Sequence, residues 1–310
     1  SASVPQQVFN RRWKMKTGTI PPTPLGVTTD QVKTNPGINN PGLVEPAGPT
    51  DPEVCFISVQ SVDGKPIALL ANYSLHYVGG VGPGHISADY FGAFAVKIGQ
   101  LLGAGPEFVG IMSNGTSGDI NNIDFRGGQE KQPPYGRIQI VANDVAQAVA
   151  AAVKNVTHVD SLPLSVAQKE IELGLRIPSK DEVEKAREIT KQSKLFPRME
   201  TMEQVYARET VLLADFPPKV SAPLQIMKIG DLHVSAIPAE VFVEIGLELK
   251  KRHSPTFTVS LANAYHGYLP TPEHHKLGGY ETWRARSSCL EVDASTKIIA
   301  GLEELFAKLK

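Results

Sequence analysis

Short apolar runs separated by turn residues open the regular part of the chain. Residues 54–59 and 67–71 are two such runs, and Asp63-Gly64 between them is a frequent hairpin turn. This pattern predicts two antiparallel strands. Residues 89–102 then place apolar side chains at helical spacing, and Gly103, which suits the end of a helix, follows them. We therefore expect a strand hairpin followed by a helix.

The alternation of strands and helices continues toward the carboxyl end. Residues 108–112 have the pattern of a buried strand, and residues 138–153 that of an alanine- and valine-rich helix. Such alternation predicts an α/β fold, a layered mixed sheet with helices on both faces. Further strands are expected over 161–175, 224–237 (divided at Gly230-Asp231) and 257–261, and further helices over 240–252 and 294–310.

Two segments depart from this pattern. Residues 1–52 are expected to form an extended arm or linker, because the eight prolines between 18 and 52 remove backbone donors and disfavour helix. Within it, the basic and aromatic stretch 9–16 is expected to pack on the domain. A capping-box sequence at Ser179 predicts a charged helix that is inserted into the main domain. That domain spans 53–310, and we expect it to be incomplete at its amino-terminal side.

Charge and hydropathy argue against two classes of function. The 310 residues include 31 basic and 32 acidic side chains, so the formal net charge of -1 gives no field that attracts nucleic acid. No apolar run is long enough for a transmembrane segment. Cys55 and Cys289 match no metal or redox pattern, and the sequence is compatible with a disulfide or with two free thiols.

Four polar segments lie at the ends of predicted strands, where site residues of layered folds gather. One segment ends at His76 and is followed by a glycine-rich loop with His85. The others are the loop 113–122, the segment 236–240 and the tyrosine-rich segment 263–281. Taken singly, each also has a structural explanation: a hydrogen-bonded histidine, a turn, an acid at a helix start, or packed tyrosines.

The order of these four segments resembles the neutral and alkaline ceramidase family. The family's Phe-Ala-x-His, its next His and its Ser-Asp-x-x-Gly correspond here to Tyr73-Ser-Leu-His76, His85 and Ala88-Asp-Tyr-Phe-Gly92. Its Asn-x-Gly-Asp-x-Ser-Pro-Asn corresponds to Ser117-Gly-Asp119-Ile-Asn-Asn122, and its Ile-Pro-Gly-Glu-Phe to Ile237-Pro-Ala-Glu240-Val. Its tyrosine segment and Tyr-Glu element correspond to 263–271 and Tyr280-Glu281.

The resemblance implies a zinc-dependent hydrolase of an amide or ester bond. The family holds zinc with two His, one Glu and one Tyr, and in this sequence His76, Glu240 and Tyr268 occupy three of these places. Tyr280 matches a tyrosine that helps to hold the carbonyl oxygen. At the other matched positions we expect Asp119 and Asn121 to be catalytic, and His85, Asn122 and Tyr265 to bind substrate.

Two departures from the family pattern matter for function. The second imidazole ligand of the family comes from a His-Thr-His-Ser-Gly element, which lies before the segment of His76, and His76 is the first histidine of this chain. We expect an amino-terminal fragment or a second chain to supply that ligand. Where the family has a serine, this sequence has Asn121, whose amide orients groups but is not a nucleophile. This difference argues against ceramide itself as the substrate.

Two other functions remain open from the sequence. A phosphoester hydrolase of the same fold has little support, since phosphate sites recruit Arg or Lys and few lie near the motifs. A non-catalytic binding or assembly subunit would agree with the missing histidine. For the leading hypothesis we expect a small-molecule or lipid-like amide substrate, a role in lipid metabolism and a secreted or periplasmic location.

Overall fold

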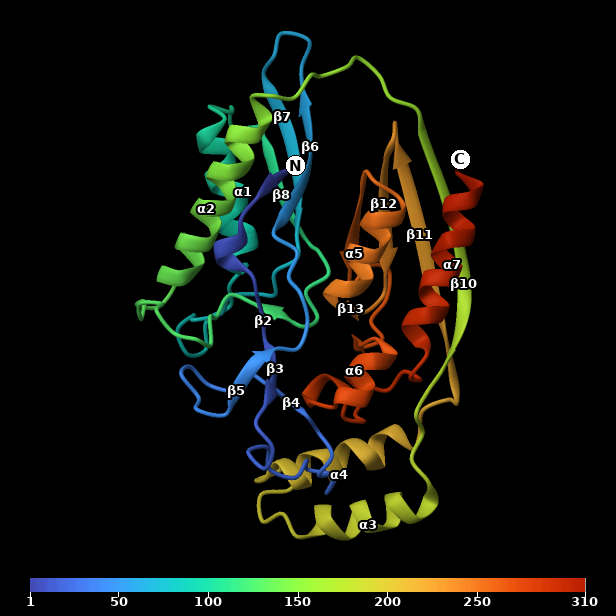
Figure 1. Ribbon diagram of the computed structural model, residues 1–310. Helices are drawn as coiled ribbons and strands as arrows, with labels where there is room; N and C mark the ends of the chain where they lie inside the picture. Colours follow the sequence, from blue (N-terminus) through green and yellow to red (C-terminus); the bar gives the residue numbers. More distant parts are fainter. Residues whose placement is uncertain (310) are drawn as a thin grey trace.

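Two four-stranded sheets form the body of the protein in a computed structural model that describes residues 1–309 (Figure 1). The first sheet has the order β1 (Ala2–Ser3), β6 (Glu53–Gln60), β7 (Pro66–Tyr73), β8 (Val109–Asn114). The second has the order β10 (Leu164–Gly174), β11 (Lys219–Ile229), β12 (Leu232–Ile237), β14 (Thr256–Ser260). β7 pairs with β8, and β12 with β14, in parallel, whereas the other pairs are antiparallel. The predicted layered α/β fold is confirmed.

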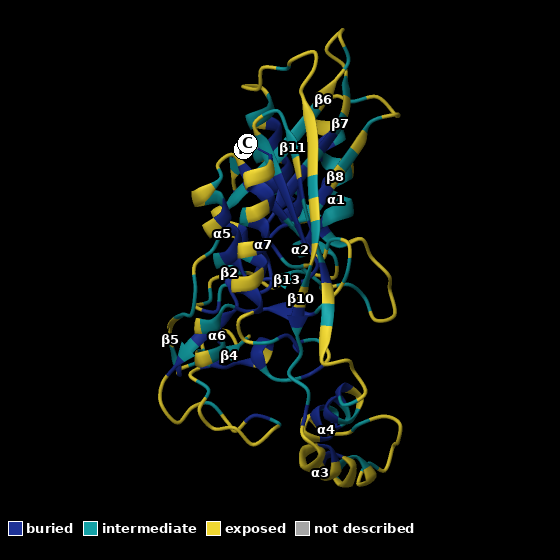
Figure 2. Ribbon diagram, turned by 90° about the vertical axis from the view of Figure 1, so that its right-hand side faces the viewer, coloured by how far each residue is buried: buried dark blue, intermediate teal, exposed yellow. Residues whose placement is uncertain are grey.

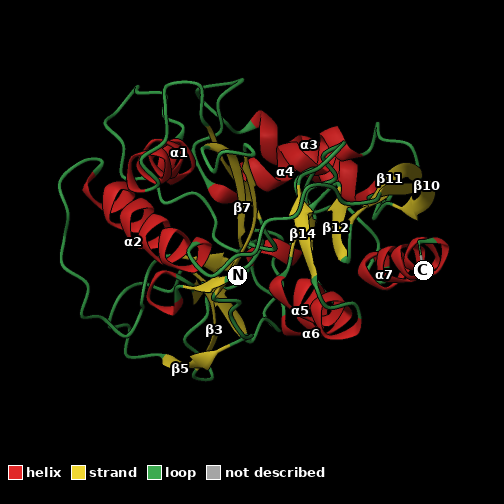
Figure 3. Cartoon of the chain, turned by 90° about the horizontal axis from the view of Figure 1, so that it is seen from above, coloured by secondary structure: helices red, strands yellow, loops and turns green. Residues whose placement is uncertain are grey.

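Each sheet buries one face under its own helices. Helices α1 (Asp89–Leu101) and α2 (Gly136–Val153) pack on the first sheet, in which Leu69 and Ala71 of β7 are fully buried. Helices α5 (Val243–Arg252) and α7 (Ala294–Lys308) share the core of the second sheet. Figure 3 shows α1 and α2 beside β7, α5 beside β14, and α7 beside β10 and β11. The apolar periodicity of strands and helices thus accounts for two separate cores.

The predicted elements agree with the structure except near Glu240. β6 and β7 form the predicted hairpin, and Ser179 starts α3 (Lys180–Lys191) with a complete capping box. The helix predicted to begin at Glu240 begins three residues later, at Val243. Glu240 itself lies in β13 (Glu240–Val241), because its N–H donates to Gly267 O (2.8 Å) and its strand pairs with β15 (Tyr268–Leu269). Cys55 and Cys289 form no disulfide.

The amino-terminal residues contribute strands to the body. β2 (Phe9–Asn10) pairs with β9 (Ile120–Asn121), and β3 (Arg12–Met15) lies between β4 (Val32–Thr34) and β5 (Leu43–Pro46). The stretch 9–16 is packed on the domain, as expected, with Trp13 almost fully buried. It places two consecutive arginines, Arg11 and Arg12, in the interior of the molecule.

Helices α3 and α4 (Met202–Leu213) form a hairpin at one end of the molecule (Figures 1 and 2). The sequence pattern predicted α3 but not α4. Most of α3 is exposed, whereas α4 buries Tyr206, Ala207 and Leu213. Across residues 1–309, no helix combines the length and the apolar character that a bilayer crossing needs.

Candidate functional site

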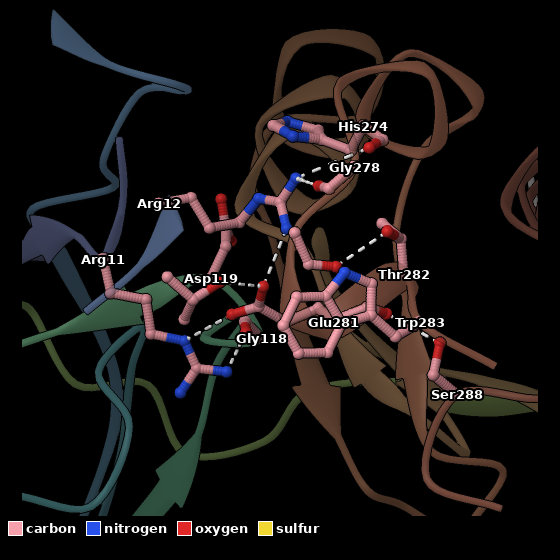
Figure 4. A network of polar contacts seen from close by, with 12 residues as sticks. Arg11, Arg12, Gly118, Asp119, His274, Gly278, Glu281, Thr282, Trp283 and Ser288 are labelled. Carbon is pink, nitrogen blue, oxygen red and sulfur yellow. Dashed lines mark hydrogen bonds and ion pairs between the residues drawn. The ribbon is translucent and has the colours of Figure 1, made fainter. Parts of the chain in front are cut away.

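Arg11 belongs to a group of polar side chains from distant parts of the chain, in which Glu281 is the shared partner (Figure 4). Arg11 Nε donates to Glu281 Oε1 (2.9 Å) and its Nη2 to Gly118 O (2.7 Å). The guanidinium also lies 5.4 Å from the centroid of the Tyr268 ring. Although burial opposes its charge, Glu281 and Tyr268 raise the pKa of Arg11 above its ordinary value. Arg11 is therefore a permanent buried cation.

Glu281 supplies the negative charge that this cation requires. Its carboxylate is fully buried, and Oε2 accepts hydrogen bonds from Arg12 Nη1 (2.7 Å) and Thr34 Oγ1 (2.6 Å). Burial alone would raise the pKa of Glu281, but Arg12 and Arg11 outweigh it and hold the pKa below the ordinary value. Arg12 also donates to Gly278 O (2.6 Å). The network thus joins the amino-terminal strands to the loop around Glu281.

Two of the predicted metal ligands, His76 and Glu240, lie close enough to Arg11 for its charge to act on both. Burial and the charge of Arg11 lower the pKa of His76 to about 4, so the imidazole is neutral at neutral pH. Glu240 and Tyr268 are direct Cα partners in the β13–β15 pair. Burial raises the pKa of Glu240, and the Tyr265 hydroxyl donates to its Oε1 (3.1 Å). The β13–β15 pairing therefore places a carboxylate and a phenol together.

Tyr268 and Tyr280 complete the group around Arg11. Their rings are T-shaped, with centroids 5.9 Å apart. Burial raises the pKa of both phenols, so both hydroxyls carry their protons at neutral pH. Tyr268 is 8% exposed and Tyr280 38%. Tyr280 therefore lies on the open side of the group, where its hydroxyl can meet a bound molecule.

Three other predicted site residues make contacts elsewhere. His85 is exposed, and its Nδ1 lies 2.6 Å from the hydroxyl of Tyr135. Asn121 donates to Asn35 Oδ1 (2.9 Å) and accepts from the N–H of Ile123. The carbonyl of the buried Asn122 accepts from Gln129 and Arg137. These contacts hold loops, and the partner of Asn121, Asn35, donates its own N–H to Arg11 O (2.8 Å).

Asp119 belongs to a second, closed cluster with Glu244 and His274. One ligand atom of each lies within 4.8 Å of the others, so the three side chains could hold a metal ion. His274 Nε2 is 2.7 Å from Glu244 Oε1, while Asp119 accepts from the N–H of Val243 (2.9 Å) and from Asn10 Nδ2 (2.8 Å). Burial, and then the charge of Glu244, raise the pKa of Asp119.

Sequence reasoning missed four residues of these two groups. Arg11 and Arg12 lie in the basic and aromatic stretch 9–16, and only their ion pairs with Glu281 in the folded protein show that they are buried. Glu244 and His274 follow no local pattern. They meet only because α5 and α6 (Pro272–Leu277) approach each other in the fold.

A pocket of about 550 Å³ opens beside Tyr280. The charged residues at its wall, Glu209 and Arg286, neutralise each other through two hydrogen bonds of 2.8 Å each. The pocket therefore offers mainly apolar and aromatic surface next to the group around Arg11. Its wall includes Met202, Val205, Tyr206, Phe216, Tyr265 and Tyr280.

Comparison with known proteins gives matches only at the level of three-dimensional structure. No family model matches the sequence, and no curated protein matches it. A crystal structure of neutral ceramidase from Pseudomonas aeruginosa superimposes with a TM-score of 0.61 and 15% identity, over 84% of this chain and 47% of that one. A ceramidase complexed with C2 gives 0.62 and 14%, over 84% and 48%. This chain thus spans about half the length of the solved structures it matches, and it has a ceramidase-like fold.

Proposed function

We propose that the protein is a hydrolase that cleaves an amide or ester bond in a substrate with an apolar part. The observation that carries this proposal is the convergence of His76, Glu240, Tyr268 and Tyr280 on Arg11, beside an apolar pocket. The ceramidase-like fold supports it. On the same basis we propose a lipid-like substrate and a secreted or periplasmic location.

We propose zinc as the cofactor, held by His76, Glu240 and Tyr268. The donor types are those that zinc takes, imidazole nitrogen and carboxylate or phenol oxygen, but the fixed positive charge of Arg11 beside them opposes the binding of a second cation. The low pKa of His76 leaves a ring nitrogen free of its proton at neutral pH. Tyr268, whose pKa is raised, would bind as its proton leaves. Zinc, when bound, would supply Lewis acidity toward a carbonyl group.

The residues of this chain would position the substrate and stabilise charge. The Tyr280 hydroxyl would donate a hydrogen bond to the carbonyl oxygen as negative charge develops on it. Arg11 adds a fixed positive charge, and Tyr265 orients Glu240 through its 3.1 Å hydrogen bond. The pocket beside Tyr280 would hold the apolar group next to the reacting carbonyl. Arg11 and Arg12 are both paired with Glu281, so neither is free to bind a phosphate group. This pairing favours amide or ester hydrolysis over phosphoester hydrolysis.

We also propose that a histidine from outside this chain completes the metal site. Three protein donors leave a weaker and more open site than four. An amino-terminal fragment or a second chain that carries a histidine would raise both zinc affinity and activity. If the purified chain alone binds one zinc tightly and turns over substrate, this part of the proposal is wrong.

Zinc analysis of matched variants tests the proposed function. At saturating zinc, His76→Ala should bind less zinc than the wild-type chain, whereas His274→Ala, in the closed cluster, should bind as much. Activity would be followed with chromogenic esters and amides, before and after removal of metal by a chelator. The opposite pattern, with zinc lost only in His274→Ala, would place the metal at Asp119, Glu244 and His274. Full zinc with no turnover of any ester or amide would favour a binding subunit.

A further inference from the structure

One positive charge acts on every ionisable side chain that we place in the open part of the site. These side chains are His76, Glu240, Tyr268 and Tyr280. Burial has the largest effect on the pKa of each, and among the charged neighbours of each the largest effect comes from Arg11. The charge of Arg11 lowers the pKa in all four cases, as a nearby cation does. The guanidinium is therefore within range of all four groups.

The backbone at Gly118 joins Arg11 to two of these side chains. Arg11 Nη2 donates to Gly118 O (2.7 Å), and the backbone of Ser117, the preceding residue, lies close enough to His76 to act on its pKa. A Cβ atom at Gly118 would lie only 2.6 Å from Glu240 O, so the two backbones are in close contact. The bond to Gly118 thus places the guanidinium beside the segments that carry His76 and Glu240.

Arg11 is fixed by its backbone as well as by its side chain. Its N–H donates to Asp119 O (2.8 Å), and its O accepts from the N–H of Asn35 (2.8 Å). The side chain is almost fully buried, with Nε paired to Glu281 Oε1 (2.9 Å) and the guanidinium 5.4 Å from the centroid of the Tyr268 ring. This cation is therefore a built part of the folded site.

A metal ion bound by the same donors would lie close to the charge of Arg11. Two positive charges a few ångströms apart repel each other more strongly inside a protein than in water, because the protein screens them less. Arg11 also already supplies Glu240 and Tyr268 with the positive neighbour that a metal would otherwise provide. The guanidinium and a metal ion are thus alternatives for one place in the molecule.

We infer that the guanidinium of Arg11 takes the place of a metal ion among His76, Glu240 and Tyr268, and that zinc enters only when the guanidinium leaves. This inference rests on the ligands named in the proposed function and concerns the regulation of that site. An arginine side chain has several rotatable bonds, so the guanidinium can leave while the backbone bonds of Arg11 stay. Arg11 would therefore limit how much zinc the chain holds.

Zinc titration of the purified chain against a fluorescent chelator tests this competition without any substrate. Arg11→Met removes the charge and keeps an unbranched side chain. Glu281 retains Arg12 as its counter-charge in this variant. We expect Arg11→Met to bind zinc at least about tenfold more tightly than the wild type, because the repulsion is removed. Arg11→Gln, which keeps a donor for Gly118 O, should show the same gain and serves if Arg11→Met does not fold.

Arg187→Met is the matched control. Arg187 is exposed on α3, so its replacement removes the same charge outside the site and should leave zinc affinity unchanged. Adding His76→Ala to Arg11→Met should abolish the gain, whereas adding His274→Ala, in the closed cluster, should preserve it. Circular dichroism would establish that the variants keep their fold.

An unchanged or weaker zinc affinity in Arg11→Met would overturn the inference, as would a gain that persists without His76. The results also separate the inference from the proposed cofactor. If the wild type binds zinc through His76 and Arg11→Met binds it no better, the cofactor stands and the competition is wrong. If only Arg11→Met binds zinc, the competition stands and zinc is not the cofactor of this chain. If neither binds zinc through His76, both are wrong.

Discussion

Two groups of ionisable side chains lie near Arg11 and Arg12, but they differ in access to solvent. The first group includes His76, Glu240 and Tyr280 and adjoins a pocket. In the second, Asp119 and His274 are almost fully buried, with Glu244 between them. Tyr280 of the first group is 38% exposed, whereas His274 and Asp119 of the second are covered by the rest of the fold.

The short distances between possible metal ligands favour the second group as a site, whereas access to solvent favours the first. The closed group has the tighter set of possible metal ligands, within 4.8 Å of one another. The open group has a neutral imidazole, a protonated phenol on its open side and a neighbouring apolar pocket. Catalysis requires access to the reacting bond, so the open group is the better candidate for chemistry.

The largest effect should come from Glu281, on which both groups depend. Glu281→Gln leaves Arg11 and Arg12 buried without a counter-charge, and the free energy of unfolding should fall by about 3–5 kcal/mol. Urea unfolding would measure this loss. Glu304→Gln, which breaks an exposed pair with Lys169, is the control and should change stability little. Equal free energies of unfolding of the two variants would contradict the role of Glu281 as the counter-charge of the two buried arginines.

Tyr280→Phe should separate chemistry from structure in the open group. The ring and its packing on Tyr268 remain, but the hydroxyl is lost, so turnover should fall by about two to three orders of magnitude while zinc stays bound. Steady-state kinetics and metal analysis would measure both. Tyr135→Phe, which removes the phenol beside His85, should leave turnover unchanged. Full activity in Tyr280→Phe would contradict the proposed hydrogen bond from the Tyr280 hydroxyl to the carbonyl oxygen of the substrate.

A smaller effect concerns the pH dependence of stability. The pKa of His76 is about 4 in the folded protein and ordinarily 6.5, so the unfolded chain binds more protons between these values. As the pH falls from about 6.5 toward 4, the free energy of unfolding should therefore decrease by about 1–3 kcal/mol because of His76. Above pH 6.5 the residue should add no pH dependence. His76→Gln should lose this part of the pH dependence in urea unfolding at pH 7, 6 and 5. His85→Gln, at an exposed position, should follow the wild type.

Local patterns in the sequence determined many of the elements and the strand-end positions of the open group. The turn at Asp63-Gly64 and the helical spacing in 89–102 depend on neighbours in the chain, so they could be predicted. The order of the motifs around His76, Glu240 and Tyr268 likewise indicated a ceramidase-like fold, which the structural matches confirm. The site roles of these residues remain predictions.

Only the tertiary structure decided which charges meet. Arg11 and Glu281 are 270 positions apart, and Glu244 and His274 are 30 apart on different helices. The helix α5 likewise begins at Val243 and not at the predicted Glu240, because Glu240 pairs with Tyr268 of β15. Periodicity reports which face of an element is buried, but not which partner covers it. Buried ion pairs and strand pairings depend on that partner, because desolvation makes each buried charge require a specific counter-charge from elsewhere in the chain.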